Sequence, residues 1–316
     1  MKVLANDGIS KSGADKLVKN GFDIITVSVE QGQLINYINK NDVVVLLVRS
    51  ATKVRKDIID SCPSLKIIGR GGVGMDNIDV EYAREKGLKV INTPAASSLS
   101  VAELVIAHLY SCVRFLHISN RNMPLEGDTN FKSLKKAFAK GIELRGKTLG
   151  IIGFGRIGQE VAKIAIGIGM HVIYYDLHND KVNIELMFFD NKKIDFSLEK
   201  SSFEDVLSKS DFITLHVPAQ KEYVIGEKEF DLMKTGAGVI NASRGGVIDE
   251  VALNKNIDEG KISFAALDTF ENEPKPEITL LMNPKISLTP HIGAATNEAQ
   301  DRIGVELADQ ITEILK

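Results

Sequence analysis

Lys147-Thr-Leu-Gly-Ile-Ile-Gly-Phe-Gly-Arg-Ile-Gly-Gln-Glu-Val-Ala162 is the stretch that decides the fold class of this chain. It begins with an apolar run typical of a buried strand, continues through a glycine turn and ends in an amphipathic run typical of a helix. Gly153, Gly155 and Gly158 fit the pattern G-x-G-x-x-G. The first glycine permits a tight turn, the second lets the backbone approach a pyrophosphate, and the third lets the helix pack closely on the strand. We therefore expect a dinucleotide phosphate at the N-terminus of this helix, where free N–H groups and the helix dipole favour an anion.

A second strand is predicted at Met170-His-Val-Ile-Tyr-Tyr175, and Asp176 follows it directly. The carboxylate lies roughly 20 residues beyond the glycine pattern, where dinucleotide domains carry an acidic partner for the ribose 2′-hydroxyl. Leu177 and His178 come next, and no adjacent arginine is present to accept a 2′-phosphate. We therefore expect NAD rather than NADP as the cofactor. The alternative is a glycine-rich turn that binds no ligand, which the surrounding strands and helix disfavour.

Length and composition are those of an ordinary globular protein. The chain has 316 residues, 44% of them hydrophobic and 26% charged, and a formal net charge of −3. This charge provides no basic surface for nucleic acid and no polybasic signal for membranes. The two cysteines, Cys62 and Cys112, show no metal or redox spacing, so we expect buried free thiols and no metal. Met1-Lys-Val-Leu-Ala5 runs directly into a first strand and no apolar stretch reaches membrane-spanning length, so we expect a cytoplasmic protein.

Apolar runs alternate with helical patterns along almost the whole chain, which predicts an α/β fold with two doubly wound parallel sheets. We expect residues 98–291 to form a Rossmann dinucleotide-binding domain, inserted into a substrate domain made of residues 1–97 and 292–316. The strands expected in the outer domain are Val3–Ala5, Asp23–Val27, Val43–Val48, Leu65–Gly69 and Lys89–Asn92, and its helices are Ser10–Asn20, Lys53–Ser61, Ile78–Lys86 and Glu298–Leu315. In the inserted domain a long helix is expected at Ser98–Phe115 and later strands at Phe212–His216, Gly238–Asn241, Ser263–Leu267 and Ile286–Leu288.

One segment departs from this alternation. Lys181–Lys200 follows Asp176 at the place where a crossover helix is usual, but its apolar residues alternate on either side of Asp190-Asn-Lys-Lys193. A period of two predicts a β-hairpin with its turn at those residues.

Three polar side chains follow apolar strand-like runs in the second half of the chain. They are Arg244, Glu273 and His291. Ligands bind outside the carboxyl ends of strands in open α/β sheets. An arginine there can bind a carboxylate through two parallel hydrogen bonds, and a histidine with a carboxylate partner can transfer a proton beside a hydride acceptor. The alternatives are a surface salt bridge for the arginine, a polar loop for the acid and a structural role for the histidine.

The motifs GFGRIG, NASRGG, ALDTFENEP and TPHIGAAT resemble those of the D-isomer-specific 2-hydroxyacid dehydrogenases. The amino-terminal runs VRSATKV, IIGRGGVGMDNID and INTPAASSLSVAEL bring the chain closest to the branch of that family that oxidises D-3-phosphoglycerate to 3-phosphohydroxypyruvate with NAD in serine biosynthesis. The resemblance covers nearly the whole chain. It implies a flavodoxin-like outer domain and a short form without the carboxy-terminal serine-sensing domain of longer relatives.

The resemblance also implies roles for individual residues. Arg244 would anchor the substrate carboxylate, His291 would accept the proton, and Glu273 would be the partner of His291. The residues implied at the cofactor are Val73, Gly153, Gly155, Arg156, Ile157, Gly158, Asp176, His216, Val217, Pro218, Ala242, Ser243, Arg244, Asp268, His291, Gly293 and Ala294. Those implied at the substrate are Arg49, Ser50, Arg70, Val73, Gly74, Arg244 and His291. Ser97 departs from the family pattern, which often has Asn there, and so does the segment 181–200.

Two alternative functions stay open. The first is another activity of the same family, on glyoxylate, hydroxypyruvate or D-lactate. Arg49 and Arg70 favour a phosphorylated substrate over these, because a small uncharged tail has less need of two arginines. The second is a non-enzymatic scaffold that senses NAD with this fold, which the set of Arg244, Glu273 and His291 disfavours.

Apolar residues without an evident neighbour predict a homodimer or a larger homo-oligomer. The helix Ser98–Phe115 carries more apolar surface than one neighbouring face needs, and Arg121–Gly141 includes Met123, Leu125 and Phe131 with no sheet of its own to cover. Such a patch usually marks an interface, and the family resemblance implies a dimer arm there. The alternative is that both segments pack inside one chain.

Overall fold

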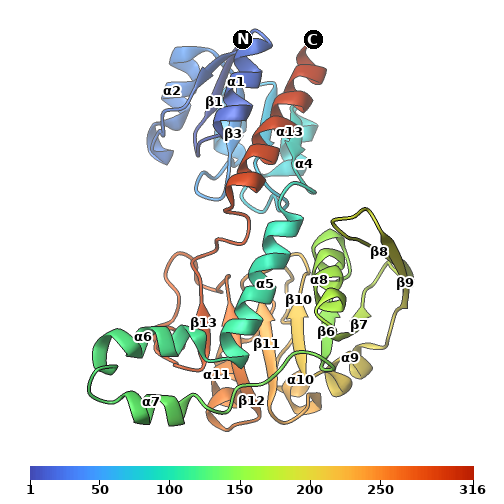
Figure 1. The fold of residues 1–316 in the computed structure, drawn as a ribbon. Coiled ribbons are helices and arrows are strands. Elements are labelled where there is room, and N and C mark those ends of the chain that lie inside the picture. Colours follow the sequence, from blue (N-terminus) through green and yellow to red (C-terminus); the bar gives the residue numbers. More distant parts are fainter. The chain divides into compact units, whose positions relative to one another are not determined.

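The computed structural model describes residues 1–316 (Figure 1). The chain forms two compact units, one made of Met1–Ser100 and Ala294–Lys316 and the other of Val101–Gly293. These boundaries lie a few residues beyond the expected ones at residues 97 and 291. Each unit contains its own parallel sheet, which confirms the α/β fold class.

The first unit is built on a five-stranded sheet in the order β2-β1-β3-β4-β5, which is the flavodoxin-like order 2-1-3-4-5. Its strands are β1 (Lys2–Ala5), β2 (Asp23–Ile25), β3 (Val43–Val48), β4 (Ile67–Arg70) and β5 (Lys89–Asn92). Its helices are α1 (Lys11–Lys19), α2 (Leu34–Asn41), α3 (Lys56–Ser61), α4 (Val80–Glu85) and α13 (Asn297–Leu315), with a 3₁₀ turn at Gln31–Gln33. Every pairing is parallel.

Helices cover both faces of this first sheet. α1 and α13 pack together over a core that includes Leu17, Leu47 and Ile303. α2 and α3 enclose a second core that includes Leu34 and Leu46. Adjacent residues of β3 thus point to opposite cores, which explains why this strand is an unbroken apolar run rather than an alternating one.

The second unit contains a six-stranded parallel sheet in the order β13-β12-β11-β10-β6-β7. Its strands are β6 (Thr148–Ile152), β7 (His171–Tyr175), β10 (Phe212–Leu215), β11 (Ala237–Asn241), β12 (Ile262–Leu267) and β13 (Ile286–Leu288). The connecting helices are α8 (Arg156–Gly167), α9 (Phe203–Lys209), α10 (Glu227–Leu232), α11 (Glu250–Asp258) and α12 (Ile278–Leu281). The strand order reverses between β6 and β10, and in sheets of this kind the dinucleotide binds at that reversal.

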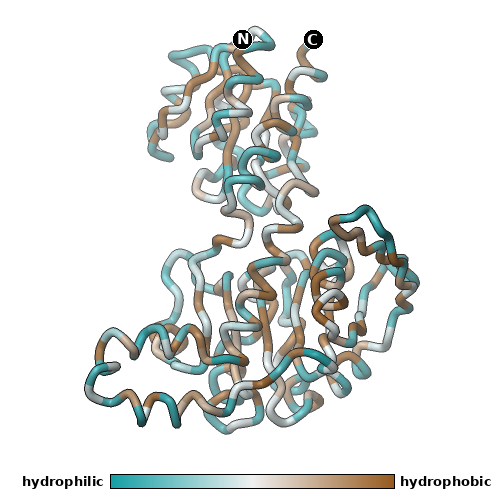
Figure 2. Tube along the Cα trace, in the orientation of Figure 1, coloured by the Kyte–Doolittle hydropathy of each residue, from teal (hydrophilic) through white to brown (hydrophobic).

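The expected strands agree with the observed ones to within two residues at each end. Figure 2 shows that many of these strands are hydrophobic along most of their length, whereas the helices around them are mixed. The expected long helix ends two residues early, as α5 (Ser98–Val113), because Phe115 has a left-handed φ of +56° and the chain turns there into α6 (Leu116–Glu126). Both cysteines are buried and free, as expected.

The expected hairpin is also confirmed. β8 (Lys181–Met187) pairs antiparallel with β9 (Lys193–Glu199) in a separate two-stranded sheet. Ile184 is the one fully buried residue of the pair and joins the core around α8, whereas Phe189 at the turn is fully exposed. Since the hairpin lies between β7 and α9 along the chain, the third strand of the usual 3-2-1-4-5-6 order is missing from the main sheet.

α5 supplies core residues to the second unit, and α6 and α7 (Phe131–Ala137) extend away from its sheet (Figure 1). These two helices leave apolar side chains exposed, among them Leu125 at 79% and Phe131 at 56%. No single helix is long and apolar enough to cross a membrane, although α5 and α6 together meet that test by length and composition across a bend of 57°.

Candidate active site

The glycine turn between β6 and α8 has the geometry that a pyrophosphate needs. Gly153 has a φ of +90°, and a Cβ there would overlap the backbone carbonyl of His216 at the end of β10. A Cβ at Gly158 would overlap the carbonyl of Gly153, so this glycine lets α8 lie against the turn. Gly155 has no heavy atom within 4 Å of its Cβ position, which leaves its surface open. α8 begins at Arg156, immediately after this open glycine, with Ile157 in its first turn.

His216 lies at the reversal of strand order, next to the glycine turn. Its Nε2 lies 3.0 Å from the Thr214 hydroxyl, and its buried Nδ1 has no hydrogen-bond partner in the protein. Burial lowers the pKa of His216 to about 3, so the imidazole is neutral at physiological pH. Val217, half-buried, and Pro218, exposed, continue the chain from there. The orphaned nitrogen and the open glycine both fit a bound dinucleotide.

Asp176 lies directly after β7, but the protein already uses much of its hydrogen-bonding capacity. Its Oδ2 accepts the Phe154 N–H at 2.6 Å, and its Oδ1 accepts the N–H groups of His178 and Asn179 at 2.8 and 2.9 Å and the Asn179 side-chain amide at 3.0 Å. Burial raises the pKa of Asp176, but these hydrogen bonds outweigh it and hold the pKa below the usual value. Because a carboxylate offers about four lone-pair sites, Oδ2 is the oxygen that can still accept a ribose hydroxyl.

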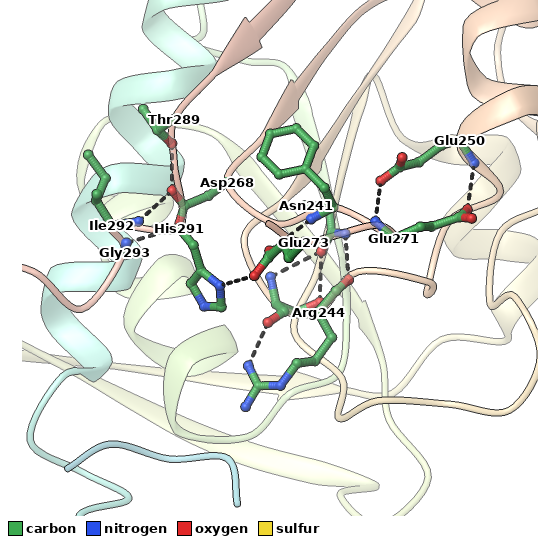
Figure 3. A network of polar contacts seen from close by, with 12 residues as sticks. Asn241, Arg244, Glu250, Asp268, Glu271, Glu273, Thr289, His291, Ile292 and Gly293 are labelled. Carbon is green, nitrogen blue, oxygen red and sulfur yellow. Dashed lines mark hydrogen bonds and ion pairs between the residues drawn. The ribbon is translucent and has the colours of Figure 1, made fainter. Parts of the chain in front are cut away.

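Figure 3 shows that Arg244, Glu273 and His291 lie close together in the second unit. They follow β11, β12 and β13, three neighbouring strands of one sheet. His291 Nδ1 lies 2.9 Å from Glu273 Oε2, and the two side chains are 39% and 37% exposed. Burial raises the pKa of Glu273, but the hydrogen bond and charge of His291, the Phe270 N–H and the charge of Arg244 outweigh it and hold the pKa below the usual value.

The loop that carries Arg244 is fixed by side chains of its own motif. Asn241 Oδ1 accepts both the N–H and the hydroxyl of Ser243, and its amide donates to the carbonyl of Arg244 at 2.8 Å. The Arg244 Nη1 donates to the Ser243 carbonyl at 2.6 Å. Ala242 and Ser243, which belong to this turn, are buried. Asn241 thus fixes the conformation of the loop that carries Arg244. It was not among the expected site residues, and its place at the start of the NASRGG motif is the only sequence signal for this role.

The backbone of His291 is held in an unusual conformation by Asp268. His291 has a φ of +55°, in the left-handed region that non-glycine residues rarely adopt. Asp268 accepts the N–H groups of Ile292 and Gly293, each at 2.8 Å, and the Thr289 hydroxyl at 2.6 Å. These bonds hold the chain on both sides of the histidine, so surrounding structure determines the strained residue.

Buried His108 on α5 contacts β13 and the start of the loop that carries His291. Its ring nitrogens lie 2.9 Å from the hydroxyls of Ser287 and Thr289, and burial lowers its pKa. Neither His108 nor Thr289 was among the expected site residues. No motif marks a histidine inside an apolar helix, whereas Thr289 opens the TPHIGAAT motif and could have been found there.

The predicted substrate residues Arg49, Ser50 and Arg70 lie in the first unit, at the carboxyl ends of β3 and β4. These strands are neighbours, and Val48 pairs with Arg70. The Arg49 guanidinium has no hydrogen-bond or ion-pair partner in the protein, and its backbone N–H donates to Asp7 at 2.6 Å.

The loop after β4 brings a glycine against the second arginine. Gly72 has a φ of +145°, and a Cβ there would overlap the Arg70 guanidinium, so this side chain lies directly over the loop. Val73 is 37% exposed, and its carbonyl accepts the Asn92 amide at 2.7 Å. Gly74 continues the same loop. Ala294, expected at the cofactor, also belongs to this unit, and its carbonyl accepts the Gln300 amide at 2.8 Å.

Comparison with known proteins agrees with this geometry. The family model described as D-isomer specific 2-hydroxyacid dehydrogenase, NAD binding domain, matches residues 106–293. The chain is 42% identical over 317 residues to a hydroxypyruvate reductase of Thermotoga maritima, covering 98% of this chain and 97% of the relative. It is 41% identical over 318 residues to a D-3-phosphoglycerate dehydrogenase of Methanocaldococcus jannaschii, covering 100% of this chain but only 58% of the relative's length.

A solved structure supports the same assignment. The crystal structure of a glyoxylate reductase from Paecilomyes thermophila matches with a TM-score of 0.81 at 28% identity, covering 98% of this chain and 93% of that one. The chain therefore belongs to the family of D-isomer-specific 2-hydroxyacid dehydrogenases, with NAD as its cofactor.

Proposed function

We propose that this chain oxidises D-3-phosphoglycerate to 3-phosphohydroxypyruvate, the entry step to serine. The observation that carries the choice of substrate is the pair of arginines at the ends of β3 and β4. Arg49 and Arg70 stand at one edge of one parallel sheet, and the Arg49 guanidinium has no partner in the protein. A phosphate carries about two negative charges at neutral pH and suits two guanidinium groups, whereas an uncharged hydroxymethyl or methyl tail does not.

Arg244, Glu273 and His291, shown in Figure 3, each have a separate role in the oxidation of the hydroxyl group. Arg244 binds the substrate carboxylate and so turns the single hydrogen of the hydroxyl-bearing carbon toward the nicotinamide. His291 takes the hydroxyl proton at Nε2, because its Nδ1 is engaged by Glu273. Glu273 orients the ring and stabilises its protonated form. NAD, when bound, supplies the hydride acceptor.

A second candidate function is the reduction of hydroxypyruvate. It is favoured by the hydroxypyruvate reductase relative, which matches this chain over nearly its whole length. The same Arg244, Glu273 and His291 serve both directions, since reduction returns the proton from His291. The two candidates differ in the need for a phosphate site, which is why the arginines of the first unit distinguish them.

Initial rates with a panel of acids test the proposal. The panel comprises D-3-phosphoglycerate, D-glycerate and D-lactate with NAD, and phosphohydroxypyruvate, hydroxypyruvate and glyoxylate with NADH. We expect the highest kcat/KM for the phosphorylated pair. A higher kcat/KM for hydroxypyruvate than for phosphohydroxypyruvate would establish the second candidate instead.

Replacing Arg70 separates phosphate binding from the chemistry. Arg70→Ala is expected to lower kcat/KM for D-3-phosphoglycerate by about 100-fold and for glyoxylate by no more than about threefold, because a lost charge-assisted contact costs several kcal/mol. Arg244→Lys is expected to slow every acid of the panel, since the carboxylate is common to all. Arg84→Ala, which removes an exposed arginine of α4 paired with Glu81, is the matched control and should change neither rate. Equal losses on all acids in Arg70→Ala would contradict phosphate recognition at that residue.

Glu273→Gln changes the pH dependence of oxidation. Oxidation needs unprotonated His291, so its rate rises with pH and reduction falls over the same range. The pKa of Glu273 is held below its usual value, so its carboxylate stays ionised across neutral pH and stabilises the protonated imidazole. Glutamine keeps the shape but not the charge, and the midpoint of the oxidation profile should move to lower pH with a reduced maximal rate. An unchanged midpoint would mean that the pair does not act in turnover.

Asp176 is expected to set the preference for NAD over NADP. Its ionised carboxylate repels a 2′-phosphate, so the wild-type kcat/KM should favour NAD by about 100-fold or more. Asp176→Asn should reduce this ratio by about tenfold, as it removes the charge and keeps an oxygen acceptor for the local N–H groups. Asp180→Ala, a nearby exposed carboxylate paired with Lys200, serves as the control. Equal efficiency of both cofactors in the wild type is the result that would refute the assignment.

We also propose a homodimer formed through α6 and α7. These helices expose Leu116, Met123, Leu125 and Phe131, a larger apolar group than a monomer usually leaves open. Sedimentation at micromolar concentration should give the dimer mass, and Leu125→Asp should shift it toward the monomer. Val18→Asp, at a similarly exposed apolar residue of α1, should not. A monomeric wild type would contradict the interface. The cytoplasmic location stays a prediction.

A further inference from the structure

Glu250 is a buried acid with no part in the chemistry derived above. It is the first residue of α11 and only 6% exposed. Its Oε1 accepts the N–H of Glu271 at 2.8 Å, while its own N–H donates to Glu271 Oε1 at 3.1 Å. Figure 3 shows this reciprocal pair of hydrogen bonds beside Glu273 and Arg244. Each glutamate side chain thus accepts the backbone N–H of the other glutamate. These two bonds hold together two acidic residues whose like charges would repel each other.

The pair joins the two loops that carry the reacting side chains. Glu250 ends the segment that begins at Arg244, and Glu271 lies two residues before Glu273. The same loops touch a second time, because a Cβ at Gly245 would overlap the carbonyl of Phe270. The close backbone approach sets the spacing of the loops, and the glutamate pair fixes their alignment.

The alignment reaches His291 through one short chain of contacts. The N–H of Phe270, next to Glu271, donates to Glu273 Oε1 at 3.0 Å. Glu273 Oε2 in turn lies 2.9 Å from His291 Nδ1. The N–H groups of Phe270 and Glu271 belong to consecutive peptides, so a shift of this backbone would move the carboxylate that orients the imidazole.

We propose that Glu250 is a positioning residue, which holds the Phe270–Glu273 loop against the Arg244 segment and so keeps Glu273 on His291. The inference rests on the proposed roles of Glu273 and His291. Glu250 touches neither substrate nor cofactor in this scheme, and it acts through the N–H of Glu271.

The electrostatics of the site explain why glutamine is an informative replacement. Burial raises the pKa of Glu250 to about 7, with the negative charges of Glu271, Glu277 and Glu273 acting in the same direction and the Glu271 N–H against it. The acid is therefore largely uncharged below neutral pH. Its Oε2 is buried without a partner, so the essential contact is the acceptor Oε1, which glutamine retains.

Four variants test the proposal. Glu250→Ala removes the acceptor and leaves the Glu271 N–H unpaired, Glu250→Asp withdraws it by one methylene, and Glu250→Gln keeps it. Glu227→Ala is the matched control, because Glu227 binds Lys255 and Asn256 of the same helix α11, away from Glu271. Thermal melting of each variant establishes folding, and Glu250→Asp remains informative if Glu250→Ala does not fold.

Hydrogen exchange of the peptide covering residues 268–275 measures the loop without any substrate. We expect exchange at least about tenfold faster in Glu250→Ala, an intermediate effect in Glu250→Asp, and wild-type exchange in Glu250→Gln and Glu227→Ala. Wild-type exchange in both Glu250→Ala and Glu250→Asp would overturn the proposal. Faster exchange spread evenly over the whole second unit would also overturn it, since that is a general loss of stability.

Turnover measures the consequence for His291. We expect Glu250→Ala to lower kcat about tenfold and to move the midpoint of the oxidation profile toward that of Glu273→Gln, with NADH affinity unchanged. Glu250→Gln should restore both values. A variant with normal kcat and midpoint despite a loosened loop would overturn the link to Glu273. A wild type inactive on every acid of the panel would instead refute the proposed function, and the exchange measurement would still decide whether Glu250 holds the loop.

Discussion

Parallel strand pairing is the constraint on which the candidate site depends. In a parallel sheet all strands point the same way, so their carboxyl ends form one edge. β11, β12 and β13 are consecutive in the chain and adjacent in the sheet, and the residues that follow them therefore emerge side by side. Arg244, Glu273 and His291 come from segments far apart in sequence, yet this one rule brings them together. The same rule places Arg49 and Arg70 at the ends of neighbouring strands in the first unit.

A few glycines let the loops at the strand ends pack closely enough to form a binding site. At Gly153, Gly158 and Gly245 a single added carbon would overlap a backbone carbonyl of another segment. The first two bring the phosphate-binding turn against β10 and α8, and the third brings the arginine loop against the glutamate loop. At each of these glycines two backbone segments pack directly on each other, which fixes their separation more tightly than flexible side chains do.

The site also contains two features that would destabilise the fold without support from neighbouring residues. His291 has a left-handed backbone, and Glu250 is an acid buried near three other carboxylates. Each is held by several hydrogen bonds from neighbouring residues: Asp268 holds the backbone after the histidine, and Glu271 exchanges backbone bonds with Glu250. Backbone strain and buried ionisable groups are tolerated where the surrounding structure determines the geometry, and here both lie next to the side chains whose orientation matters.

The sequence by itself determined the class of fold, the dinucleotide turn and the identity of the main polar residues. These follow from local patterns: apolar runs of strand length, glycines at fixed spacing, and the alternation that predicts the hairpin at 181–200. The tertiary structure alone decided the polar contacts that surround these residues. Asp176 bonds to Phe154, His108 supports Thr289, and Glu250 pairs with Glu271, and no periodicity marks any of these contacts. The physical reason is that hydrogen-bond partners are chosen by the register and packing of elements distant in the chain, whereas sequence patterns report only on neighbours along it.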